Sequence, residues 1–192
     1  MRQLLPLLIF ALAGCIMVRE GNNEIKNWPI QPVSTKKSIS IGITKDPEPV
    51  GKGESSSKER SVVFQEQIIK AYELSGLFSR VTVGSDPADL KAEIVISGDE
   101  GKSNGFLRVL NGITLALIPD RIEYSPTLET VYTDSKGNRL TEITKKEDVS
   151  VWIEFFLLFA MPFVDSPSTV AEAVYYDLNR ATIEEALAKG VF

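Results

Sequence analysis

Few residues of this chain could carry out acid–base, nucleophilic or metal chemistry. The 192 residues include no histidine and one cysteine, Cys15. Without histidine, Ser-His-Asp and Cys-His catalytic arrangements and histidine-ligated zinc are excluded. The acidic pairs Asp86 with Asp89 and Asp99 with Glu100 could serve acid–base catalysis or calcium binding, but neither lies in a calcium-loop pattern. We therefore predict turn-forming or solvated carboxylates, no bound metal or other cofactor, and no enzymatic activity.

Two serine-containing segments fit no nucleophile or phosphate motif either. The run 98–103 ends in Gly-Lys-Ser, but the first glycine of a phosphate-binding loop would have to stand where the chain has Ile96. The residues after it also favour a strand over the helix that such a loop opens. The run Ser55-Ser56-Ser57 is expected in a loop, and no Gly-x-Ser-x-Gly elbow is present.

Acylation is the chemistry that remains open to the cysteine. Arg2 precedes an apolar stretch, residues 4–12, and Ala13-Gly14-Cys15 follows in the order of an export signal. The pattern resembles the lipobox of bacterial lipoproteins, which signal peptidase II cuts before the cysteine, here between Gly14 and Cys15. This resemblance implies a diacylglyceryl group on the thiol and usually an acylated amine. Because several acyl chains anchor stably, we expect Cys15 to hold the protein on a lipid bilayer.

Three alternatives to a lipoprotein signal are a transmembrane helix, an ordinary secretory signal and a buried first helix. Residues 4–18 fall short of the about 20 apolar residues that a spanning helix needs, and they include Pro6. An ordinary signal would not require the cysteine. The following residue is Ile16, not the aspartate that retains some enterobacterial lipoproteins in the inner membrane. We therefore expect a cell-envelope location, at the outer membrane rather than the inner one.

Composition favours one globular domain and disfavours nucleic acid as a partner. Hydrophobic residues make up 43% of the chain and charged residues 24%, with a net charge of −5. Removal of residues 1–14 takes away one basic side chain, Arg2, and makes the balance more acidic. An acidic chain argues against nucleic-acid binding and against a polybasic membrane patch. With Cys15 as the only cysteine, no internal disulfide is possible.

The chain divides into a signal peptide at 1–14, a lipidated N-terminus with a flexible tether at 15–37, and an α+β globular domain at 38–192. The tether is inferred from its glycine, prolines and polar run. Trp28 is the exception within it: it could pack on the domain or sit at the membrane interface, and we expect it to pack on the domain. The polar segment 44–57 is predicted to be a long loop, either a binding loop or a solvated excursion.

Periodicity places the elements of the domain. Alternating apolar residues predict strands, and spacings of three and four predict helices. Gly76 is expected to end the first helix, Gly137 to permit a hairpin turn, and Thr169 with Glu172 to form a capping box. The predicted strands are 38–43, 78–83, 90–97, 106–118, 121–133 and 139–149, and the predicted helices are 58–75 and one from 166–169 to about 190. These predict a single antiparallel or mixed sheet with two helices packed on one face.

Residues 151–164 form an almost wholly apolar segment. As a helix it would be about 21 Å long, too short for a hydrocarbon core of about 30 Å. Three interpretations remain: a core element covered on both faces, a monotopic insert beside the lipid anchor, and a partner-docking surface. The residues that would contact a membrane or a partner are Trp152, Phe155, Phe156, Leu158 and Phe159.

The motifs of this chain, in their order, resemble those of certain envelope proteins. Residues 64–83, with Ser75-Gly76-Leu77-Phe78, and the later Ala88-Asp89-Leu90 resemble small α/β lipoprotein modules of the Gram-negative envelope, of which the curli secretion lipoprotein is an elaborated relative. The runs Leu117-Ile118-Pro119 and Met161-Pro162-Phe163 are similar to segments of uncharacterised lipoproteins. The resemblance implies an accessory role in secretion, transport or cell-wall synthesis. It assigns no functional residue.

Two functional hypotheses follow. The first is a membrane-anchored, non-enzymatic accessory or interaction module at the periplasmic face of a membrane, with another envelope protein as partner. The alternative is a membrane-active or pore-forming oligomer that inserts residues 151–164. An exposed apolar segment would favour the alternative, and a buried one the first hypothesis.

Overall fold

The computed structural model describes residues 14–21, 28–30, 35–45 and 54–192. Its strands are β1 (Gly14–Arg19), β2 (Lys37–Lys45), β3 (Phe78–Val83), β4 (Leu90–Ser103), β5 (Asp120–Asp134), β6 (Arg139–Lys146) and β7 (Val149–Glu154). Its helices are α2 (Glu54–Leu74), α3 (Gly105–Ile113), α4 (Leu157–Ala160), the 3-10 helix η1 (Met161–Phe163) and α5 (Pro167–Ala188). Within the described ranges, no helix is both long and apolar enough to cross a membrane.

The elements form a mixed sheet and two compact units. Among the described residues, seven strands pair in the order β1-β7-β5-β4-β2-β3, with β6 added to β5. Unit 1 comprises residues 1–22, 98–125 and 148–171, and unit 2 comprises 23–97, 126–147 and 172–192. The long strands β4 and β5 contribute residues to both units.

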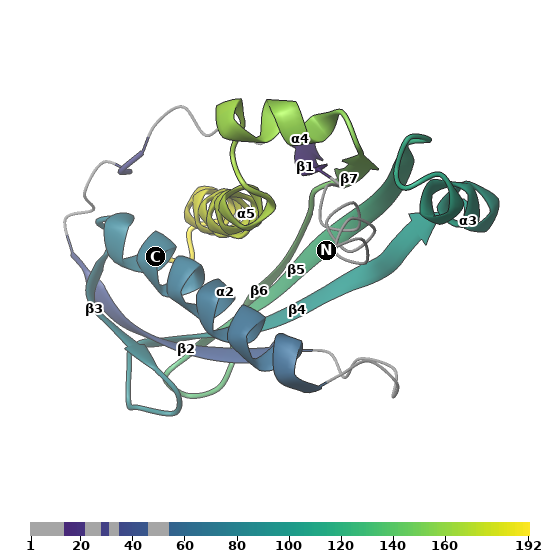
Figure 1. Cartoon of the computed structure of the whole chain (residues 1–192). Coiled ribbons are helices and arrows are strands. Elements are labelled where there is room, and N and C mark those ends of the chain that lie inside the picture. Colours follow the sequence, from purple (N-terminus) through teal and green to yellow (C-terminus); the bar gives the residue numbers. More distant parts are fainter. Residues whose placement is uncertain (1–13, 22–27, 31–34, 46–53) are drawn as a thin grey trace. The chain divides into compact units, whose positions relative to one another are not determined.

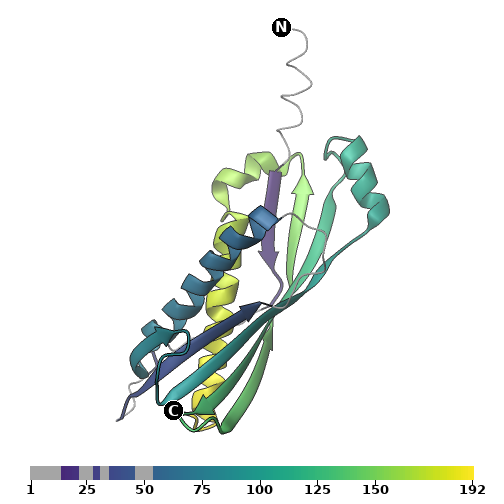
Figure 2. The same cartoon turned by 90° about the horizontal axis from the view of Figure 1, so that it is seen from below.

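Unit 2 encloses its own core. Strand β2 pairs in parallel with β3 and β4, and β5 pairs with β6 as an antiparallel hairpin. Helix α2 lies beside the part of α5 that belongs to this unit (Figures 1 and 2), with the rings of Phe64 and Tyr175 4.1 Å apart. The hydroxyls of Tyr72 and Tyr132 share a buried hydrogen bond of 2.7 Å. Burial raises the pKa of both phenols above the ordinary tyrosine value.

Unit 1 is built on three antiparallel strand segments. Strand β1 pairs with β7 from Gly14 opposite Glu154 to Arg19 opposite Val149, and β7 pairs with the first residues of β5. Helices α4 and η1 follow β7 directly. Helix α3 lies between β4 and β5 in the chain, so both helical segments of this unit adjoin strand ends.

The mixed sheet was predicted correctly, but the prediction of two helices was wrong. The described residues contain four α-helices. Residues 106–118 were expected to be a strand, whereas α3 covers 105–113. The reason is that its apolar residues Phe106, Val109 and Ile113 also fit a helical spacing, and the Asn104 side chain caps the helix by accepting from the backbone N–H groups of Phe106 and Leu107.

Other local predictions had mixed outcomes. Gly76 and Gly137 have φ of 75° and 84°, as expected for a helix end and a hairpin turn. Helix α5 is capped differently from the prediction, because the hydroxyl of Ser166 accepts the backbone N–H of Thr169 at 3.2 Å. Trp28 packs on unit 2, with the guanidinium carbon of Arg180 5.0 Å from its ring centroid.

Two predicted boundaries differ from the structure. Residues 15–19 belong to β1, although the tether was predicted over 15–37; β-branched Ile16 and Val18 suit a strand, and hydrogen bonds to β7 hold it. The predicted loop 44–57 is shorter, because β2 continues through Lys45 and α2 begins at Glu54. Residues 46–53 of that loop lie outside the described residues.

Candidate functional site

The expected acylation residue stands at the start of β1. Cys15 is half-buried and lies opposite Ile153 of β7, and burial raises the pKa of its thiol. The preceding Gly14 lies against α4, since a Cβ there would collide with the backbone of Leu157 and Leu158. The chain therefore reaches Cys15 directly beside the helix that follows β7.

Helix α3 exposes an apolar stripe. Phe106, Val109 and Ile113 lie on one side of the helix, and Phe106 and Ile113 are 71% and 74% exposed. None of the nine residues is buried. On the other side, the Asn111 amide donates to the carbonyls of Ile118 at 2.7 Å and Ile153 at 3.0 Å. This amide fastens α3 to the end of β7 while the stripe points away from it.

A strained turn follows α3. Leu115 and Ala116 have φ of 52° and 63°, a left-handed conformation that disfavours residues other than glycine. The turn is held by a 2.7 Å hydrogen bond from the Ala116 N–H to the Asn111 carbonyl. The Ala116 carbonyl in turn accepts the Phe155 N–H at 2.7 Å. As a result Leu115 and Leu117 are exposed, and the turn is tied to the residue where the α4 segment begins.

The apolar segment 151–164 divides into two parts. Its first residues form β7 and are paired on both sides, so Trp152 and Ile153 belong to the sheet. Its later residues do not enter a core: Phe159 is 66% exposed and Phe163 87%. The ring of Phe155 contacts the rings of Phe156 and Phe159 edge to face.

Of the five residues proposed for membrane or partner contact, the structure thus brings four together. Phe156 and Phe159 are well exposed, and Phe155 and Leu158 are half-exposed beside them. Trp152 lies apart from them, on the strand. The sequence prediction did not include α3 or the turn after it, because it assigned those residues to a strand.

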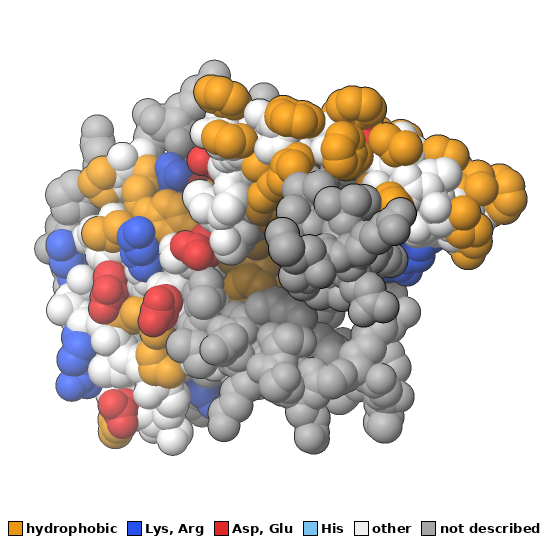
Figure 3. All heavy atoms as spheres, viewed as in Figure 1, with side chains coloured by type: hydrophobic (Ala, Val, Ile, Leu, Met, Phe, Trp, Pro, Cys, Tyr) orange, Lys and Arg blue, Asp and Glu red, His pale blue; other side chains and the backbone are white. Residues whose placement is uncertain are grey.

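We call the exposed apolar surface of unit 1 the apolar end. It consists of Phe106, Val109, Ile113, Leu115, Leu117, Phe156, Phe159, Met161, Phe163 and Val164. Figure 3 shows hydrophobic side chains gathered over α4 and α3 on the viewed face. Beside η1, a groove of about 610 Å³ is lined by residues of β1 and of the segment after α4, among them Ile16, Val18, Phe163, Asp165 and Val170.

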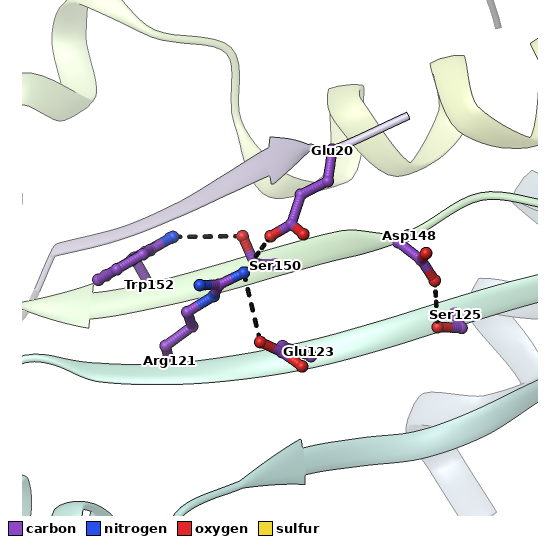
Figure 4. Close-up of polar contacts among 7 residues, drawn as sticks. All are labelled: Glu20, Arg121, Glu123, Ser125, Asp148, Ser150 and Trp152. Carbon is purple, nitrogen blue, oxygen red and sulfur yellow. Dashed lines mark hydrogen bonds and ion pairs between the residues drawn. The ribbon is translucent and has the colours of Figure 1, made fainter. Parts of the chain in front are cut away.

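Trp152 belongs to a polar cluster on the sheet of unit 1 (Figure 4). Arg121 forms ion pairs with Glu20 and, at 3.3 Å, with Glu123. Its guanidinium carbon lies 5.3 Å from the Trp152 ring centroid, and the indole N–H donates to Ser150 at 3.2 Å. These side chains stand on one face by the register of β1, β7 and β5. Because the cation already has two carboxylates and a ring, we interpret the cluster as structural.

The carboxylates singled out by the sequence have local roles where they are described. Asp89 accepts hydrogen bonds from the backbone N–H of Ser38 at 2.8 Å and from its hydroxyl at 2.7 Å, and these bonds lower the pKa of its carboxyl. The side chains of Asp99 and Glu100 lie outside the described residues. Among the residues that are described, no group of three metal-ligating side chains comes together. Gly101 and Ser103 lie in strand β4, not in a phosphate loop.

Comparisons with known proteins add distant fold likenesses. No family model matches the chain, and no curated protein matches it. A neuraminyllactose-binding hemagglutinin homolog from Helicobacter pylori is 14% identical, with a TM-score of 0.43 over 88% of this chain and 87% of that one. A minor lipoprotein from Acinetobacter baumannii is 11% identical, with a TM-score of 0.37 over 79% and 93%. The PelC dodecamer from Paraburkholderia phytofirmans is 8% identical, with a TM-score of 0.33 over 88% and 95%.

The fold and the site define a class of protein by themselves. It is a mixed α/β protein in which one unit encloses a core between sheet and helices, and the other carries an exposed apolar end. The cysteine of the lipobox-like sequence lies in that second unit, opposite Ile153 of β7.

Proposed function

We propose that this chain is a lipid-anchored protein of the bacterial envelope that works without catalysis, as an accessory or interaction module held close to a membrane. The observation that carries the proposal is the position of Cys15. It pairs with Ile153 near the end of β7, whose carbonyl accepts the Asn111 amide of α3, and α4 follows β7 in the chain. Acyl chains on Cys15 would therefore leave the protein beside its exposed apolar surface.

The non-enzymatic part of the proposal is supported by what the described acidic residues do. Asp89 binds Ser38, and Asp134 accepts the backbone N–H groups of Lys136 and Asn138 at 2.8 Å each in the hairpin turn. These bonds lower the pKa of the Asp134 carboxyl, with the Asn138 contacts the largest cause. A general acid needs a raised pKa near the working pH, so these two carboxyls are suited to holding backbone groups in place, Asp89 at β2 and Asp134 in the hairpin turn.

A membrane-active, oligomeric lipoprotein is the second candidate, because α4 and η1 are exposed. The contacts limit how much could insert. Residues 149–154 pair with β1 and residues 149–153 pair with β5, so insertion of all of 151–164 would break both sets of backbone hydrogen bonds. An insertion confined to 156–164 would break neither.

Membrane fractionation with mass spectrometry of the N-terminal peptide tests the anchor. We expect the chain in the membrane fraction, with a diacylglyceryl group on Cys15 and cleavage after Gly14. Cys15→Ala should remain uncleaved and unmodified. Met17→Ala, on the same strand, is the matched control and should be processed normally. Cleavage at another position with an unmodified thiol would contradict the proposal.

In-cell crosslinking tests the accessory role. The lipidated protein is crosslinked, recovered and analysed beside Cys15→Ala. We expect a specific envelope protein that is lost in the variant. Recovery of self-crosslinked species alone would favour the membrane-active oligomer instead.

A further inference from the structure

We propose that the apolar end is a membrane-docking surface that enters the same lipid leaflet as the acyl chains on Cys15. The choice of a bilayer as the occupant rests on the proposed lipid anchor. The surface itself is argued from contacts within unit 1, and the experiment below separates a failure of the anchor from a failure of the docking surface.

The three segments of the apolar end are connected at their bases. Asn111 on the inner side of α3 donates to Ile118 and to Ile153, the last part of β7. The turn carbonyl of Ala116 accepts the N–H of Phe155, where the α4 segment starts. Because these bonds hold the polar side of each segment, the exposed side chains of all three project from one end of the unit.

The side chains that project are suited to lipid. Residues 105–119 and 155–164 contain a single charged residue, Arg108. Arg108 lies on α3 away from the Phe106, Val109 and Ile113 stripe, and an arginine there can reach the headgroups while the stripe enters the acyl region. Aromatic and branched apolar residues exposed in this number exceed the scattered ones of an ordinary surface.

The backbone of the turn after α3 also indicates that the exposed apolar residues have a functional role. Two consecutive left-handed residues, Leu115 and Ala116, are an unfavourable way to build a turn. The turn places Leu115 and Leu117 in solvent, where neither contributes much to the unit's own core. Helix α3 has nine residues and none of them is buried, so packing on its own chain also stabilises it little. Both features are explained if lipid covers the surface.

A bilayer fits the position of the surface better than another occupant does. Cys15, the first residue left after the expected cleavage, lies at the start of β1, opposite Ile153 near the end of β7, and α4 follows β7 in the chain. Anything attached to Cys15 is thereby brought to this end of unit 1. Helix α3 is about 13 Å long at 1.5 Å per residue, so it suits a shallow, interfacial position and not a span of about 30 Å.

The experiment uses environment-sensitive labels in the lipidated protein, reconstituted in vesicles of phosphatidylethanolamine and phosphatidylglycerol. Since acylation occupies Cys15, one introduced cysteine can be labelled at a time. Val109→Cys and Phe163→Cys report on the apolar end. Arg108→Cys is the matched control on the other side of α3, and Ser135→Cys, in the exposed hairpin turn of unit 2, is the aqueous control.

We expect blue-shifted emission and severalfold stronger quenching by a lipid-phase quencher at positions 109 and 163 than at 108 and 135. Equal aqueous signals at all four positions would overturn the docking surface. Labels that are aqueous in vesicles but protected in intact cells would overturn it too, in favour of a protein partner. Mass spectrometry of Cys15 in the same samples reports on the anchor. An unmodified Cys15 would refute the anchor; the labels are then placed in Cys15→Ala, where lipid quenching at positions 109 and 163 would keep the surface.

Discussion

Helices α3 and α5 show how differently the two units use apolar residues. Helix α5 places six residues in the buried part of the molecule, Val174, Leu178, Asn179, Thr182, Ile183 and Ala186. Helix α3 places none there, although more than half of it is apolar. The difference teaches that the apolar residues of α5 are used for the core of unit 2, whereas those of α3 in unit 1 stay exposed and contribute little to a core.

Backbone strain follows the same division. In the described part of unit 2, the residues with positive φ are glycines, including Gly76 and Gly137. In the described part of unit 1 they are Leu115 and Ala116. Glycine adopts this conformation without a steric penalty. Unit 2 therefore avoids strain by placing glycine at these left-handed positions. Unit 1 retains strain at the turn that exposes Leu115 and Leu117.

The largest effect that would test this contrast is a truncation in α5. Leu178 is fully buried in unit 2, so Leu178→Ala should lower the free energy of unfolding by about 2–5 kcal/mol. Ile113→Ala removes as large a side chain from α3 and should change it by no more than about 0.5 kcal/mol. Urea denaturation followed by circular dichroism measures both. Similar losses in the two variants would show that α3 is part of a folded core.

The tyrosine pair of unit 2 should give the next largest effect. Tyr132→Phe leaves the Tyr72 hydroxyl buried without its 2.7 Å partner, and we expect a loss of about 1–3 kcal/mol. Replacing both tyrosines by phenylalanine should recover most of it. Because burial raises the pKa of both phenols, their stabilising contribution should be full below the ordinary tyrosine pKa of about 10 and fall as pH rises above it. Urea denaturation of the wild-type protein and the two variants over a pH series is the measurement.

Sequence periodicity was sufficient for unit 2 and insufficient for the apolar end of unit 1. The stripe of Ile68, Ala71 and Tyr72 in the first helix is buried, as its spacing indicates. In such elements one face is apolar and the other polar, so the period identifies the structure. Residues 106–118 are apolar on nearly every side, and alternation and helical spacing fit them equally well. The cap at Asn104 was the signal that could have decided for a helix.

Only part of the candidate site could be predicted from the sequence. Segment 155–164 stands out by composition, so its role in contact could be proposed from sequence alone. The joining of this segment to α3 depends on two long-range bonds, from Asn111 to Ile153 and from Phe155 to Ala116. No spacing in the sequence encodes such contacts between residues about forty positions apart.

Removal of the Asn111 amide should weaken the base of the apolar end. Asn111→Ala leaves two carbonyls without their side-chain donor, and we expect a loss of about 1–2 kcal/mol. Hydrogen exchange should accelerate at the N–H of Phe155 and Ala116, while Tyr72 in unit 2 keeps its protection. The matched control is Asn104→Ala, which should loosen the start of α3 at Phe106 and Leu107 alone. Unchanged exchange at Phe155 in Asn111→Ala would refute the tie between the segments.

The smallest expected effect has the opposite sign. Asparagine tolerates the left-handed conformation better than leucine, so Leu115→Asn should raise the free energy of unfolding by about 0.5–1 kcal/mol. Leu117→Asn makes the same chemical change at an exposed residue without positive φ and should not stabilise. Both variants should weaken lipid quenching at a label on position 109. A gain in stability in Leu115→Asn with that loss of lipid contact would show that the strained turn is kept for the membrane and not for the fold. If Leu115→Asn is no more stable than Leu117→Asn, the turn stores no strain and this support for the docking surface falls away.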